Sequence, residues 1–387
     1  MKIVNKLQKA ILLLSMIFLV VSCDEKSEEV VKLPTIYDIV STDANFSILK
    51  KAIEKTSPAS DNNSILNRVK GAGSYTVFAP TNAAFIAAGV TEASVDALNP
   101  ASTVPADVSA ISTLRRRLQN HILGVGTLSS DLPSDGYVKT FAAGVGSTTL
   151  SMYVNKSSGV VLNGGTANGG ATVTTANIEA SNGIVHVIDN VMTLPTLVNH
   201  IKANPSLSTL LAVVTSGVGG SFGDQSAVLN LLTTANSNAV YASNNTNPAI
   251  TLFAPLNSAF TSATASGGFL TGANFDPATN LGTNVTKVLQ YHVSQSLPFT
   301  PPAVATVGNL SAASNTAWST STTSDSTIRT IAPTSTTGTQ TFLITRQTLK
   351  ITELPAISAP ASILKTVNIQ ATNGIIHTID RVLQPVL

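Results

Sequence analysis

The sequence has little charge, one tryptophan and one cysteine. Charged residues make up only 11% of its 387 residues, and the net charge is +2. The single cysteine, Cys23, excludes a disulfide within the chain and zinc sites built on several cysteines. The near balance of charges gives no basic surface of the kind that binds nucleic acid. Apolar cores must therefore hold the fold together.

Apolar residues, by contrast, are plentiful, at 43% of the chain. The length is sufficient for two or three domains, and the composition excludes an intrinsically disordered protein. Because charge is scarce, serine, threonine, asparagine and glycine must cover much of the surface. This composition is typical of a β-rich protein outside the cytoplasm.

The N-terminus has the pattern of an export signal. Lys2, Lys6 and Lys9 precede an apolar run, AILLLSMIFLVV, at residues 10–21. This run is shorter than the roughly 20 residues that a membrane-spanning helix needs. An apolar run of this length behind a basic segment is typical of a signal peptide, which we predict over residues 1–22.

The cysteine follows this run directly, in the sequence LVVSC that ends at Cys23. This sequence resembles a bacterial lipobox, which implies that residues 1–22 are a lipoprotein signal peptide and that Cys23 is lipidated. The alternative is an ordinary secretory signal with a chance cysteine. Residues 23–32 contain the acidic run DEKSEE and are predicted to be a solvated tether. The run also resembles the acidic stretch of Bacteroidetes-type lipoproteins on the outer face of the outer membrane.

Most of the remaining chain consists of two similar copies of one sequence pattern. TVFAPTNAAF recurs as TLFAPLNSAF, LRRRLQNHILG is matched by VTKVLQYHVSQ, and SNGIVHVIDNVM recurs as TNGIIHTIDRVL. The three pairs lie at residues 76–85 and 251–260, 114–124 and 285–295, and 181–192 and 372–383. The distance along the chain between matched blocks is too long for the repeat unit of a solenoid, so each copy is predicted to be a domain.

We place the first domain at residues 33–194 and the second at residues 195–387. The spacing between matched blocks increases in the second copy near residues 211–250 and 296–345. Both regions are rich in serine, threonine, asparagine and glycine. We expect them to be polar insertions in surface loops.

Within one copy, helical spacing precedes strand-like alternation. Residues 107–123 are predicted to form a helix with His121 on the apolar side, beside Leu114 and Leu118. Strands are predicted at residues 75–79, 148–154, 160–162, 171–177 and 183–191. Each copy is therefore an α+β domain, with helices packed around a small β-sandwich or barrel.

These blocks resemble the fasciclin domain. The resemblance rests on the FAPTNxAF block, which contains Asn82 or Asn257, on a Tyr-His pair at a helix end, Tyr291-His292, and on the NGxxHxID block. It covers roughly residues 33–387, which is nearly all of the predicted mature chain. The first copy departs from the pattern in one place, where an asparagine stands before His121.

The resemblance implies two tandem α+β domains and a role in cell adhesion, matrix attachment or carbohydrate contact, without catalysis. The residues leave two further interpretations open. One is a non-catalytic accessory subunit of an outer-membrane complex of the glycan-uptake type. The other is a metal-dependent or hydrolytic enzyme that uses repeated histidines.

Four histidines and two aspartates recur at matched positions and could form a site. Two histidines and a carboxylate in each domain would suit non-haem iron or a hydrolase. However, residues three apart on a strand point to opposite faces, so the histidine and aspartate of the last block should not converge. We expect structural residues, with no cofactor, no metal and no catalytic role. The matched pairs are His121 and His292, His186 and His377, and Asp189 and Asp380.

Two other features could contact a ligand. Arg115, Arg116 and Arg117 form a basic run on the predicted histidine helix, which we interpret as a solvated face, with contact to an acidic glycan or lipid headgroup as the alternative. Trp318 lies in a serine- and threonine-rich segment and could stack on a sugar or pack against its own domain.

The leading hypothesis is a lipid-anchored protein of the bacterial outer membrane, facing the cell surface. It would bind a glycan, a matrix protein or an envelope protein. The periplasmic face is the alternative location.

Overall fold

The fold is taken from a computed structural model. It describes residues 33–58, 61, 64–144, 148–218, 220, 222–234, 250–264, 283–295, 326–333, 339–345, 350–354, 362–366 and 368–383. Cys23, the tether and Trp318 lie outside this set. The described residues from Pro34 onward belong to one structural unit. No helix within the described ranges has the length and apolar character needed to cross a membrane.

Helices form the first part of the N-terminal copy, and most of the short ones begin at a capping side chain. Thr35 caps the first helix through a reciprocal pair of hydrogen bonds with Asp38, and Thr81 caps the helix after the FAP block. Val104 provides no such bond, but Pro105 suits a first helical position. The helices are α2 (Ile36–Thr42), α3 (Ser47–Lys55), α4 (Ile65–Lys70), α5 (Asn82–Ala87), α6 (Glu92–Asp96) and α7 (Pro105–Gln119).

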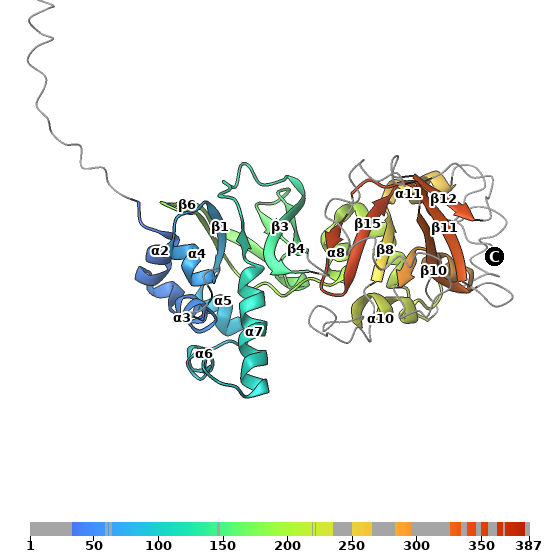
Figure 1. The fold of residues 1–387 in the computed structure, drawn as a ribbon. Helices are drawn as coiled ribbons and strands as arrows, with labels where there is room; N and C mark the ends of the chain where they lie inside the picture. The colour runs from blue at the N-terminus through green and yellow to red at the C-terminus, as the bar shows by residue number, and fades with distance from the viewer. Residues whose placement is uncertain are drawn as a thin grey trace, which may run out of the picture. The chain divides into compact units, whose positions relative to one another are not determined.

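Seven strands of this copy close into a barrel in the order β1 to β7. Strands β1, β3, β4 and β6 are labelled in Figure 1. The last strand lies parallel to the first, with Tyr75 opposite Gly183, so the FAP and NG blocks become neighbours. The strands are β1 (Tyr75–Pro80), β2 (Ile122–Leu123), β3 (Asp135–Ala143), β4 (Thr149–Asn155), β5 (Val161–Leu162), β6 (Ala171–Ala180) and β7 (Gly183–Ile188).

Two of these elements differ from the sequence prediction. The helix predicted to reach residue 123 ends at Gln119, because Ile122 and Leu123 pair with β1 as a short strand. Strand β3 was not predicted. Most of its side chains are partly exposed, so the alternation that marks a half-buried strand is weak there.

Gly183 is needed because two strands approach closely at this point. A Cβ atom added there would lie 2.0 Å from the carbonyl oxygen of Tyr75, and its φ is +150°. In the second copy, a Cβ on Gly374 would lie 2.2 Å from the oxygen of Ile250. The turn itself lies at Ser181 and Asn182, so the repeated glycine serves the close packing of the strands.

The apolar side chains of the first copy pack on both sides of the barrel wall. Phe85 belongs to the cluster under the helices, whereas Phe78 and Met152 belong to a cluster with β4, β5 and β7. All three are fully buried. Each contributes roughly 1.5–3 kcal/mol relative to an exposed position, which explains how a domain without disulfides is held together.

The second copy repeats this order of elements, and β15 again lies parallel to β8. Its described strands form two sheets, β10-β11-β12-β13 and β14-β15-β8-β9. The elements are α8 (Leu197–Ala203), α9 (Ser208–Val214), α10 (Ser226–Thr234), β8 (Ile250–Pro255), α11 (Asn257–Thr264), α12 (Thr283–Tyr291), β9 (Val293–Gln295), β10 (Ser326–Pro333), β11 (Thr339–Thr345), β12 (Lys350–Leu354), β13 (Ser362–Ile363), β14 (Ile369–Gln370) and β15 (Gly374–Ile379).

The regions expected to be polar loop insertions contain regular structure. Helix α10 lies within residues 211–250, and strands β10 and β11 lie within residues 296–345. Residues 235–249 and 296–325 of these two regions lie outside the described residues, so their place in surface loops stays a prediction. The predicted α+β class is confirmed.

Candidate functional site

The repeated histidine of the first copy joins the end of α7 to the segment after β7. His121 Nε2 lies 2.9 Å from the backbone N–H of Met192 and accepts its hydrogen bond. The proton is therefore on Nδ1, which donates to the carbonyl oxygen of Arg117 at 2.7 Å. Burial lowers the pKa of His121 to about 4 because the charged form would lose its hydration.

The second copy repeats this arrangement atom for atom. His292 accepts from the N–H of Leu383 at 2.9 Å and donates to the oxygen of Val288 at 2.7 Å. Burial lowers its pKa to about 4 as well. Both ring nitrogens of each histidine are used by backbone groups, so binding a metal or transferring a proton would require the loss of one of these hydrogen bonds.

The histidines of the last strands are also bonded to the backbone. His186 accepts from the N–H of Asn177 at 3.2 Å and donates to the oxygen of Thr127 at 3.0 Å. His377 accepts from the N–H of Asn368 at 3.2 Å. Burial lowers the pKa of both rings, to about 3 for His377.

The paired aspartates do not join these histidines. Asp189 is exposed at the end of β7 and accepts from the N–H of Thr172 at 2.7 Å. Asp380 accepts from the N–H of Ile363 at 2.7 Å and forms an ion pair with Lys365 at 3.2 Å. Within the described ranges, no group of three histidine, cysteine, aspartate or glutamate side chains could hold a metal ion.

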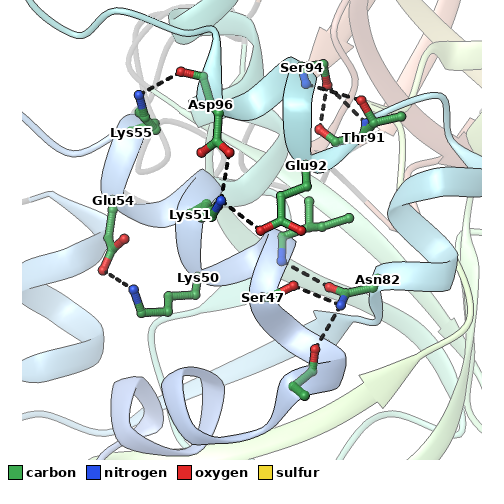
Figure 2. Close-up of polar contacts among 12 residues, drawn as sticks. Ser47, Lys50, Lys51, Glu54, Lys55, Asn82, Thr91, Glu92, Ser94 and Asp96 are labelled. Atoms are coloured by element: carbon green, nitrogen blue, oxygen red, sulfur yellow. Dashed lines mark hydrogen bonds and ion pairs between the residues drawn. The ribbon is translucent and has the colours of Figure 1, made fainter.

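The asparagine of the FAP block connects α5 to the segment that leads into α3 (Figure 2). Asn82 accepts from the N–H of Ile48 at 3.0 Å and donates to the oxygen of Ala44 at 2.8 Å. In the second copy, Asn257 accepts from the N–H of Thr209 at 2.9 Å. These side chains replace backbone partners that the short helices cannot supply.

The NG block holds a second bridging asparagine that sequence analysis missed. Asn182 accepts from the N–H of Ile36 at 2.8 Å and donates to the oxygens of Val69 and Gly71, both at 2.9 Å. Its match in the second copy, Asn373, forms corresponding bonds with Leu197 and Leu232. The repetition of this asparagine was visible in the sequence, but its place in an Asn-Gly pair indicated only a turn.

The residue before the repeated histidine is buried in both copies. Asn120 is fully buried and donates to the oxygen of Thr193 at 3.1 Å. Tyr291 is 1% exposed. The Tyr-His pair of the second copy therefore lies inside the domain and is not presented on its surface.

The three arginines of α7 differ in their surroundings, and the interpretation as a solvated face was wrong. Arg116 is 5% exposed and donates twice to the oxygen of Ala143. Arg115 donates to the oxygen of Thr56 at 2.6 Å. Arg117 is half-buried and lines a solvent-open groove of about 290 Å³ between α6 and α7. The partner of Arg116 comes from a strand 27 residues away, which helical periodicity cannot reveal.

The groove beside α7 is open to solvent and has one cationic side chain in its lining. The corresponding helix of the second copy, α12, instead lines a small cavity of about 20 Å³. That cavity is large enough for about one water molecule. Among the described residues, the two copies therefore share their bridging side chains, whereas the hollows beside the histidine helix differ in size.

Comparison with known proteins gives one matching family. The model of the fasciclin domain matches residues 44–195 and 223–385. The uncharacterized protein sll1735 of Synechocystis sp. is 29% identical over 160 residues, which cover 41% of this chain and 98% of that protein. A solved structure of a FAS1 domain pair from the insect cell adhesion molecule fasciclin I is 17% identical, covers 90% of this chain and 96% of that chain, and has a TM-score of 0.41. The chain belongs to the fasciclin domain family and carries two copies of the domain in tandem.

Proposed function

We propose that this protein is a lipid-anchored protein of the bacterial cell envelope that mediates adhesion or captures an extracellular ligand, such as a glycan or a matrix protein. The observation that carries the proposal is the pair of fasciclin domains behind a signal-like segment that ends in Cys23. Fasciclin domains are associated with cell adhesion. Two domains on one anchored chain can also raise avidity without strong individual contacts.

A non-catalytic role is supported by the chemistry of the repeated motifs. The groups most suited to catalysis, His121 and His292, use both ring nitrogens to hold backbone segments together. His186 is fully buried and also bonded to the backbone through both nitrogens. The repeated motifs thus serve to build the domain, which leaves its surface for recognition.

The anchor and the orientation are tested together on intact cells. The Cys23→Ser variant should lose incorporation of a labelled fatty acid and leave the membrane fraction. External protease should cleave the wild-type protein while a periplasmic control protein stays intact. Protection of the wild type would contradict a role at the cell surface.

The ligand is tested with the purified protein on arrays of glycans and matrix proteins. Saturable binding to one class that unlabelled ligand displaces would support capture. If the arrays are silent and affinity purification from native membranes gives a stoichiometric partner, the accessory-subunit role is correct and the capture role is wrong.

A further inference from the structure

The groove between α6 and α7 has an apolar floor and one cationic side chain. Helix α7 contributes Ala110, Thr113, Leu114 and Arg117, whose spacing of three and four residues places them on one face. The opposite wall is formed by the segment around α6. It contains Val90, Ser94, Val95 and Leu98. A volume of about 290 Å³ lies at the small end of the range for ligand sites, roughly 300–1,000 Å³.

The α6 wall is held in place without a ligand. Lys51 on α3 forms ion pairs with Glu92 and Asp96 of α6, each at 2.7 Å (Figure 2). Lys55 donates to the carbonyl oxygens of Asp96 and Leu98, both at 2.9 Å. Val95 is 1% exposed and anchors the helix in the core beneath. The groove is therefore preformed, so a ligand need not supply the free energy of ordering its wall.

Arg117 has fewer partners than its burial requires. One guanidinium nitrogen donates to the oxygen of Val191 at 3.3 Å, a long bond. Its Nε is buried with no hydrogen-bond partner, and no carboxylate among the described residues forms an ion pair with it. A half-buried guanidinium stays charged, and the absence of a counter-charge costs stability.

The second copy shows that the fold does not need this cation. The position that matches Arg117 is Val288, which is 4% exposed and packs in the apolar core. The histidine bond next to it is the same in both copies. The fasciclin fold therefore accepts an apolar residue at this position and does not require the arginine. Because the guanidinium has no counter-charge within the described residues, we infer that its partner is a ligand outside the chain.

We propose that this groove binds a small amphiphile with one carboxylate and a short apolar chain, such as a medium-chain carboxylic acid. The carboxylate pairs with Arg117, and the chain lies along Val95, Leu98 and Leu114. A single guanidinium balances a single negative charge and matches a carboxylate in its geometry. A phosphate dianion would need further donors, and no other cationic side chain lines the groove among the described residues. This site does not depend on the proposed adhesive role.

Octanoate and 1-octanol test the proposal, because they share a chain and differ in charge. Titrations of the purified protein by calorimetry should show saturable binding of octanoate with a Kd on the order of 1 mM or tighter. Octanol should bind about tenfold more weakly. Arg117→Met keeps the apolar stem and should reduce octanoate affinity about tenfold while leaving octanol affinity unchanged.

Two matched variants locate the site. Arg115→Gln removes the same charge from the same helix but lies outside the groove, so octanoate binding should be unchanged. Ala110→Trp fills the groove from an exposed position and should abolish binding of both compounds. Each variant must first show the thermal unfolding of a folded protein. The proposal is overturned if octanoate shows no saturable binding, if octanol binds equally well, or if Arg117→Met and Arg115→Gln have equal effects.

Discussion

In both copies of the domain, an asparagine before the last strand accepts from the first residue of the first helix. The distances are 2.8 Å for Asn182 and 2.9 Å for Asn373. The repeated histidines, His121 and His292, form the same two bonds with equal distances. The two copies therefore have the same side-chain hydrogen bonds to the backbone at these positions, although the residues between them differ widely.

The copies differ on the face of the histidine helix. Arg117 lines an open groove of about 290 Å³, whereas Val288 lines a cavity of about 20 Å³. The part of the second copy that follows α11 lies outside the described residues up to α12, so the comparison concerns the helix face alone. The bridging bonds are therefore requirements of the fold, whereas the residue on this helix face can differ between the copies.

The glycine at the start of the last strand should be the most severe test of the shared framework. Gly183→Ala and Gly374→Ala would each place a Cβ within 2.2 Å of a backbone oxygen of the neighbouring strand. We expect a loss of about 4 kcal/mol or more in the unfolding free energy of the affected domain. Chemical denaturation of each variant measures this loss. A loss under about 1 kcal/mol in either copy would contradict the common role of the glycine.

Exchanging Arg117 and Val288, the matched residues that differ between the copies, should change the stability of the two copies unequally. Val288→Arg would bury a cation in an apolar core, and we expect a loss of about 3–4 kcal/mol in stability. Arg117→Val replaces a poorly paired cation with the residue of the other copy, and we expect a change within about 1 kcal/mol. Denaturant unfolding of both variants gives the comparison. Equal losses would mean that the arginine is a structural part of the first copy.

The bridging asparagine should be needed equally in both copies. Asn182→Ala leaves a buried N–H of Ile36 and the oxygens of Val69 and Gly71 without that partner. We expect a loss of about 2–3 kcal/mol, and a similar loss for Asn373→Ala. Hydrogen exchange should show faster exchange at the start of α2 or α8, according to the copy changed. Unequal losses would break the equivalence that the hydrogen bonds indicate.

The buried histidines should make both copies less stable in acid. Their folded pKa of about 4 lies below the unfolded value of about 6.5, so the unfolded chain binds protons first as the pH falls. Each histidine should therefore remove about 2 kcal/mol between pH 7 and pH 5. His121→Gln and His292→Gln should each reduce this pH-dependent loss by that amount. An unchanged pH dependence in both variants would contradict the neutral, buried state.

The fold class and the repeats could be predicted from the sequence because they depend on local patterns. The capping of α5 by Thr81 and the strand that begins at Gly183 follow from blocks that are contiguous in the chain. The parallel pairing of this strand with β1 joins blocks far apart in the chain and was not predicted. The burial of Arg116 could not be predicted, since its acceptor, Ala143, comes from a strand whose own pattern is weak. The groove beside Arg117 lies between two helices that a loop separates in the chain. No residue spacing in the sequence indicates such a hollow.

The ion pairs that hold α6 should have the smallest effect. Lys51 has no equivalent in the second copy, where Ala212 stands at the matched position. The Lys51→Ala variant removes two exposed pairs, which water and salt screen, so the melting temperature should fall by less than about 2 °C. The fall should vanish in about 1 M salt. Because Val95 still anchors α6 in the core, octanoate affinity should change less than about twofold. A large loss of octanoate affinity at unchanged melting temperature would show that the ion pairs, and not the core, shape the groove that distinguishes the first copy.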